Sequence, residues 1–274
     1  MSSWAPATRA ESGVPARIAG CETVNAPALC LLGGPYVVED GRLLEVPERS
    51  MRLLVFIALH PGRVDRRHAA GSLWPDGGDE RAAGNLRSAL WRLRGAGIDM
   101  LRADKCALWM DPGTEVDVRI IDHWAGRIID GEFRPDDLGV PRWGAEAMDL
   151  LPGWYDDWVV FERERLRQRL LHALETLSRN LADAGRYAQA IEVALEAVRA
   201  EPLRESAHRR LLEAHLAEGN LVEARRLYGD YRALVRRELG VEPSPALSGL
   251  VYAPPPRADA RPRQFHGLRV APVR

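Results

Sequence analysis

Short apolar runs and turn residues alternate over the first part of the chain. After Ala28 the segment LCLLGGPYVVEDGRLLEV contains two apolar runs joined by Asp40-Gly41, a pair typical of a type I′ hairpin. Residues 50–60 (SMRLLVFIALH) are strongly apolar and predict a helix. This helix is expected to end at Pro61-Gly62. Asp65 is expected to cap a short helix through Trp74, and residues 75–78 (PDGG) to form a loop.

Residues 80–94 (ERAAGNLRSALWRLR) predict an amphipathic helix that Asp79 caps and that ends at Gly95 or Gly97. One apolar stripe recurs at helical spacing: Ala82, Leu86, Ala89, Leu90 and Leu93. At about 100° per residue the opposite face carries Arg81, Gly84, Ser88 and Arg92. The flanks between these faces carry Asn85, Arg87, Trp91 and Arg94. One face therefore anchors the helix, and the other offers donors that bind phosphates and read base edges.

Two short strands, residues 100–102 and 107–110, follow this helix and predict a second hairpin. The order is then sheet, helix, helix, loop, helix, hairpin. This order is typical of a winged helix-turn-helix, in which the third helix enters the major groove and the hairpin is the wing.

The second half predicts helices alone, at roughly residues 157–184, 187–200, 204–218 and 221–238. Residues 184–190 (AGRYAQA) are echoed by residues 218–224 (EGNLVEA), 34 residues later, which is the period of tetratricopeptide repeats. We expect the preceding helix to cap the two repeats, with one face of Trp154, Trp158 and Phe161 packed on the first repeat or on the winged helix. The fold class is mainly α with a small β component.

Four segments follow from this pattern. Residues 1–26 and 252–274 are expected to be disordered, residues 27–120 to form the winged helix, and residues 121–251 the helical domain. The chain of 274 residues is long enough for two cores.

Charge and cysteine content narrow the class of protein. The formal net charge is −1, so any nucleic-acid binding must use a local patch. The three cysteines have no metal-ligand spacing and no apolar run reaches the length of a membrane span, which predicts a cytoplasmic, nucleoid-associated protein without membrane contact.

Motifs of known enzymes are missing from the sequence. Lys105 is the one lysine and no Walker A loop surrounds it, and there is no Gly-x-Ser-x-Gly or His-Glu-x-x-His. Asp156-Asp157 fits a helix start better than a carboxylate pair, and His208 and His215 fit a groove or surface better than a metal site. The arginines at 163, 165, 167 and 169 fit a solvated face, because Glu162 and Glu164 offset them. We therefore expect no enzyme activity, no cofactor and no metal.

A resemblance to known families rests on the winged-helix order and on residues 150–174, LLPGWYDDWVVFERERLRQRLLHAL. The first part resembles the DNA-binding domain of OmpR-like response regulators. The second resembles the opening of the bacterial transcriptional activator domain. Together, over about residues 28–251, they resemble the SARP family of antibiotic regulatory proteins in actinobacteria.

Candidate DNA contacts follow from the faces of the third helix. Base edges are assigned to Arg81, Asn85, Ser88, Trp91 and Arg92, and phosphates to Arg87 and Arg94. In the wing, Arg102 and Lys105 are expected to make minor-groove or phosphate contacts at most. At the second helix, Arg63, Arg66 and Arg67 are expected to hold a phosphate together with the backbone amides of the helix N-terminus.

The resemblance implies a mode of action. Family members bind promoter direct repeats overlapping the −35 region as dimers or tandem copies, recruit RNA polymerase through sigma factor and other subunits, and control secondary-metabolite clusters. By this likeness, the segment from Trp74 through Asp76 to Asp79 is a candidate polymerase contact.

Two alternatives remain open at this point. One is a regulator whose helical-repeat groove holds a small molecule or peptide that controls DNA binding. The other is an adaptor whose winged helix has lost DNA binding. The adaptor would tolerate acids on the exposed face of residues 81–94, where the sequence has none.

Overall fold

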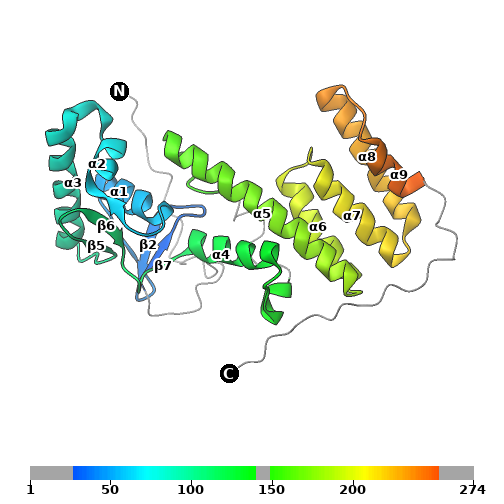
Figure 1. The fold of residues 1–274 in the computed structure, drawn as a ribbon, viewed down its shortest axis with the longest axis horizontal. Coiled ribbons are helices and arrows are strands. Elements are labelled where there is room, and N and C mark those ends of the chain that lie inside the picture. Colours follow the sequence, from blue (N-terminus) through cyan, green and yellow to red (C-terminus); the bar gives the residue numbers. More distant parts are fainter. Residues whose placement is uncertain (1–26, 140–148, 253–274) are drawn as a thin grey trace.

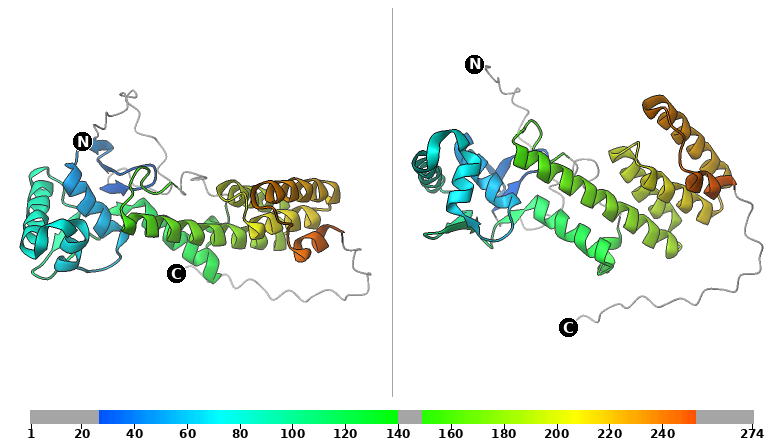
Figure 2. Two further views of the ribbon diagram at one scale, coloured as in Figure 1. Left: turned by 90° about the horizontal axis from the view of Figure 1, so that it is seen from above. Right: turned by 45° about the horizontal axis from the view of Figure 1, so that its top comes forward.

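The computed structural model describes residues 27–139 and 149–252. Two small sheets and helices α1–α3 lie at one end, helices α6–α9 lie at the other, and the long helix α5 runs between them (Figure 1). The views of Figure 2 show the same arrangement from two further directions. The expected terminal disorder falls outside the described residues.

The N-terminal sheet has the strand order β3-β2-β1-β7. Its strands are β1 (Ala28–Cys30), β2 (Tyr36–Glu39), β3 (Arg42–Leu44) and β7 (Glu115–Val116). Asp40 and Gly41 join β2 to β3 with φ of 48° and 72°, and a type I′ turn needs positive φ at both positions. The predicted hairpin is confirmed.

The winged-helix order is also confirmed. It comprises α1 (Glu48–Leu59), β4 (Val64–Asp65), α2 (Arg66–Leu73), the 3₁₀ turn η1 (Pro75–Gly77), α3 (Gly78–Gly95), β5 (Leu101–Ala103) and β6 (Ala107–Met110). The Asp65 carboxylate caps α2, because it accepts from the amides of Arg67 at 2.8 Å and His68 at 3.0 Å.

The start of α3 differs from the prediction. The helix begins at Gly78 after a 3₁₀ turn, and no side chain caps it. Gly78 has a φ of 63°, which glycine adopts readily because it has no Cβ atom. This conformation lets the chain turn directly from η1 into α3. Asp79 is therefore not the cap. It lies in the first turn, where its negative charge interacts favourably with the positive end of the helix dipole.

The helical half matches the expected ranges within one residue. Its main helices are α5 (Asp157–Asp183), α6 (Tyr187–Ala200), α7 (Glu205–Glu218) and α8 (Leu221–Leu239). Gly185 and Gly219, 34 positions apart, both have positive φ at the turns that follow α5 and α7. Three further helical elements were not predicted from the sequence: α4 (Asp117–Asp130), η2 (Pro135–Leu138) and α9 (Pro245–Tyr252).

A continuous core links the two halves. One cluster of buried side chains runs from Leu29 in β1 to Ala214 in α7. At the joint, the ring of Phe56 in α1 meets the edge of Trp158 in α5 at 5.2 Å. Trp154 packs on Trp158, whereas Phe161 is 79% exposed, so the expected packing face is wrong for Phe161. The predicted boundary after residue 120 lies inside α4.

Three arginines of α5 are engaged in contacts within the protein. Arg163 is half-buried and donates to the carbonyl oxygens of Leu150 and Leu151 at 2.8 Å and of Trp154 at 3.0 Å. Arg165 and Arg167 pair with acids and are not a free basic stripe.

Of the two histidines of α7, His208 is not what the sequence predicted. His208 is buried, its Nε2 lies 2.9 Å from the carbonyl oxygen of Pro202, and its ring stacks on Tyr231 at 3.9 Å. Burial lowers the pKa of His208. It is a core residue, not a groove or surface residue. His215 is partly buried, and the described residues contain no cluster that would hold a metal ion.

Asp117 fastens the start of α4 to the N-terminal sheet. Its buried carboxylate accepts from the amides of Leu31 at 2.8 Å, Leu32 at 2.9 Å and Val118 at 2.7 Å. Burial raises the pKa of Asp117, and the three amide donors oppose that rise.

Replacing Asp117 with Ala should lower the free energy of unfolding by about 2–5 kcal/mol, because the amides of Leu31 and Leu32 lose their acceptor inside the protein. Urea denaturation of the full chain measures this change. The control is Asp130→Ala, at the exposed end of the same helix, which should leave the midpoint unchanged. Equal midpoints for the two variants would refute the role given to Asp117.

Candidate nucleic-acid interface

Helix α3 has one buried and one exposed face. Ala82, Leu86, Ala89 and Leu93 are buried, which confirms most of the predicted stripe. Leu90 is only half-buried, so the centre of the buried face is turned toward Ala89. The exposed face therefore turns by the same amount.

The predicted contact residues of α3 lie on this exposed face. Asn85 is half-exposed, and the fully exposed residues are Arg81, Arg87, Ser88, Trp91, Arg92 and Arg94. Within the described ranges, the four arginines have no ion-pair partner, unlike Arg165, Arg167 and Arg169 of α5. Their charge is thus available to an anionic partner.

Trp91 is more prominent than predicted. It was placed on a flank, yet it is 75% exposed. The turn of the buried face toward Ala89 explains this, because the outermost line of α3 then passes through Gly84 and Trp91.

Arg81 lies against the segment before the helix. A Cβ on Gly77 would lie 3.2 Å from Arg81 Cδ, so the arginine stem covers this glycine. Asp76 and Asp79 are exposed beside it, and Trp74 is half-buried against the core. The expected polymerase contact is therefore an acidic, accessible turn adjoining the arginine face.

The N-terminus of α2 has no amides left for a phosphate. The amides of Arg67 and His68 bind the Asp65 carboxylate, and that of Arg66 donates to the carbonyl oxygen of Cys106 at 2.9 Å. The expectation that these amides hold a phosphate is wrong. The exposed Arg67 and half-exposed Arg66 side chains remain candidates.

Two arginines at the wing form ion pairs with aspartates of the same domain. Arg102 pairs with Asp111 and Asp99, which raises the pKa of Arg102. Arg63 pairs with Asp104 and lies over the ring of Trp109 at 4.2 Å.

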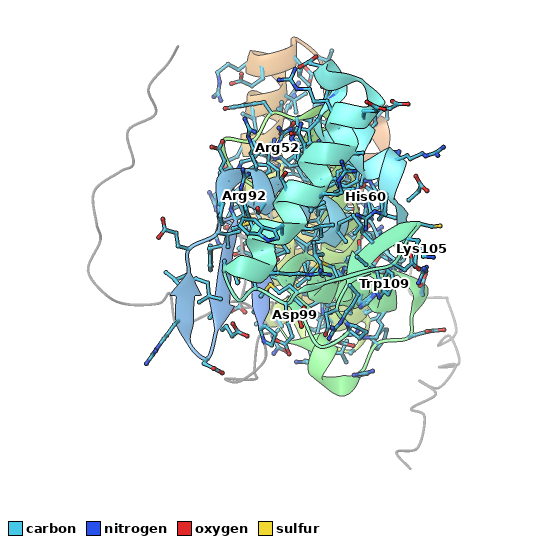
Figure 3. The ribbon with its side chains drawn as sticks, turned by 90° about the vertical axis from the view of Figure 1, so that its left-hand side faces the viewer. Arg52, His60, Arg92, Asp99, Lys105 and Trp109 are labelled. Carbon is cyan, nitrogen blue, oxygen red and sulfur yellow. The ribbon has the colours of Figure 1, made fainter. Side chains whose placement is uncertain are left out.

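Asp104 shapes the turn of the wing. It accepts from the amides of Ala107 at 2.7 Å and Cys106 at 2.8 Å, and these bonds lower the pKa of Asp104. Lys105 is left exposed at the tip. Figure 3 shows this end of the molecule, with Arg92 on one side of α3 and Lys105 and Trp109 on the other.

A hollow lies between α2, α3 and the wing. Its basic lining comes from all three elements, with Arg66 and Arg67, Arg87, and Lys105. Asp79, Glu80 and Asp104 also line it. The structure thus brings together residues that the sequence assigned separately to helix and wing.

Comparisons with known proteins bear on the helical half first. Residues 137–253 match the model of the bacterial transcriptional activator domain. The regulatory protein AfsR of Streptomyces griseus is 35% identical over 108 residues, which is 39% of this chain and 11% of that protein. AfsR of Streptomyces coelicolor gives the same identity and coverage. The chain spans about a tenth of these relatives.

The fold also matches a solved structure, Mycobacterium tuberculosis EmbR in complex with a low-affinity phosphopeptide. The TM-score is 0.57 at 18% identity, over 82% of this chain and 64% of that one. At this identity the likeness concerns the fold alone. The resemblance to SARP-type regulators is confirmed by the domain match and the AfsR relatives. No helix in the described ranges is long and apolar enough to cross a membrane.

Proposed function

We propose that this protein is a sequence-specific DNA-binding transcriptional activator and not an enzyme. The observation that carries the proposal is the exposed face of α3, where four arginines project from the third helix of a winged-helix fold and have no acidic partner among the described residues. The activator domain at residues 137–253 supports a role in transcription.

The individual roles follow from position on the surface. Arg81, Asn85, Ser88, Trp91 and Arg92 face base edges in the major groove. Arg87 and Arg94 flank them and contact phosphates, as do Arg66 and Arg67 of α2 and Lys105 of the wing. Arg102 reaches DNA only by giving up its pairs with Asp111 and Asp99.

The proposal extends to the promoter and its partners. The protein binds direct repeats near the −35 element as a dimer or tandem pair, recruits RNA polymerase holoenzyme, and activates a secondary-metabolite cluster. The last point follows from the resemblance to the SARP family of antibiotic regulatory proteins. Footprinting on the promoters of the neighbouring genes, with and without polymerase, tests all three. Protection without sequence preference, or none at all, would overturn the proposal.

The helical repeats favour an activator over an effector sensor. Between α5 and α7, Glu175 accepts from Arg204 and from Ser206, each at 2.6 Å. Arg204 also donates to Gln168 at 2.8 Å. Because these polar side chains bind each other, they are not free to bind a ligand.

Replacing Asp76 with Lys should lower transcription while leaving operator affinity unchanged or slightly raised. Asp76 is exposed beside Arg81, close to the proposed duplex, where an acid repels phosphate and suits a basic protein partner. In vitro transcription with purified polymerase, together with operator binding at the same salt concentration, measures both quantities.

The matched control is Glu132→Lys, the same charge change at an exposed site after α4. It should change neither quantity. If transcription by the Asp76 variant follows operator occupancy as in the wild type, the turn is not a polymerase contact.

A further inference from the structure

Trp91 is a large apolar side chain at the outermost line of α3. It is 75% exposed, and it lies seven residues, or two helical turns, after Gly84. A Cβ on Gly84 would meet only Arg87 Nη2, at 3.7 Å, so the space in front of this part of the helix is open. Ser88, between the two, is also small. The helix can therefore approach a partner closely here, and the indole ring of Trp91 projects toward that partner.

The charges around Trp91 indicate the class of partner. The neighbours within one turn are Arg87, Ser88, Arg92 and Arg94, all exposed, and there is no acid from Arg81 to Ile98. Phe161 of α5 is similarly exposed but has the exposed acids Asp157 and Glu164 one turn away. An exposed apolar ring on a helix face that carries arginines and no acid suits a polyanion with an apolar group within it.

We propose that Trp91 is a specificity residue that contacts the 5-methyl group of a thymine in the major groove. This rests on the proposed function, because it assumes that α3 enters that groove. Among the groups that base pairs present in the major groove, the apolar one is the thymine methyl. It therefore distinguishes thymine from the other three bases. Trp91 would thus recognise a base that the neighbouring arginines, which favour guanine, do not read.

The expected effect is that of one buried methyl group. Removing such a group costs about fourfold in affinity. A phosphate contact would behave differently, since it lowers affinity for all sequences and changes the salt dependence.

The test begins with selection of 40-base-pair duplexes from a random library by the full chain and by its Trp91→Ala variant. Because Trp91 is exposed, the variant should keep the wild-type melting temperature, which thermal denaturation checks. The wild type should enrich a fixed thymine that the variant does not. Replacing that thymine with deoxyuridine, which lacks the methyl group, should weaken wild-type binding about fourfold and leave binding by the variant unchanged.

Arg94→Ala is the matched comparison on the same helix. It should weaken binding to the thymine and deoxyuridine probes by the same factor and reduce the salt slope by about one unit, whereas Trp91→Ala should leave the slope unchanged.

Four outcomes would overturn the inference. The variant could bind the deoxyuridine probe more weakly than the thymine probe, as the wild type is expected to do. The wild type could also bind both probes equally while still enriching one sequence. Either result would refute the role of Trp91 and leave the proposed function standing. The variant could also bind like the wild type and lose only transcription, which would make Trp91 a protein contact. If the wild type enriches no sequence, the inference and the proposed function fail together.

Discussion

A chain that ends at Asp130 is expected to unfold more easily and to bind operator DNA at least tenfold more weakly than a chain that ends at Val251. The winged helix shares its core with α5, and truncation uncovers side chains that α5 covers, including Phe56. Uncovering one large apolar side chain costs about 1.5–3 kcal/mol. Thermal denaturation and fluorescence anisotropy with operator DNA measure the two effects.

Two substitutions in the full chain separate bracing by α5 from dimerisation through the helical domain. Trp158→Ala removes the contact with Phe56 and should lower the free energy of unfolding by about 2–3 kcal/mol. Phe161→Ala, three residues on, removes an exposed ring and should change it by less than about 0.5 kcal/mol. Equal stability of the short and long chains, or equal effects of the two substitutions, would contradict a shared core.

Replacing Arg92 with Ala is expected to weaken specific DNA binding by about 1–3 kcal/mol, roughly 5- to 150-fold, if Arg92 makes a bidentate contact with a guanine. The fold should survive, because Arg92 is exposed and has no ion-pair partner within the described ranges. Binding to specific and non-specific duplexes at one salt concentration separates a base contact from a phosphate contact.

Arg179→Ala, an exposed arginine of α5, is the control for loss of one charge and should leave binding unchanged. If Arg92→Ala keeps full operator affinity, or loses specific and non-specific affinity equally, Arg92 does not read a base.

The sequence alone determined the elements that depend on local interactions. Asp40-Gly41 fixed a hairpin because both positions require positive φ, and Asp65 capped α2 through its own neighbouring amides. The 34-residue echo placed α5–α8 within one residue, because helical periodicity and glycine turns are written in consecutive positions. The arginine face of α3 followed from the same periodicity.

Only the tertiary structure decided which of these side chains are engaged elsewhere. Arg63 pairs with Asp104, which lies 41 residues further along the chain, and Arg163 binds carbonyl groups of the preceding loop. Such partners are brought together by packing, which no local pattern encodes.

The exact orientation of α3 was also a tertiary result. Packing against the core left Leu90 half-buried and turned Trp91 outward, a rotation that an idealised 100° step does not contain. The shared core arose in the same way, because Trp158 finds Phe56 about a hundred residues away. The sequence by itself determined the elements and their amphipathic faces, while long-range packing decided which cations and aromatic rings remain free for a partner.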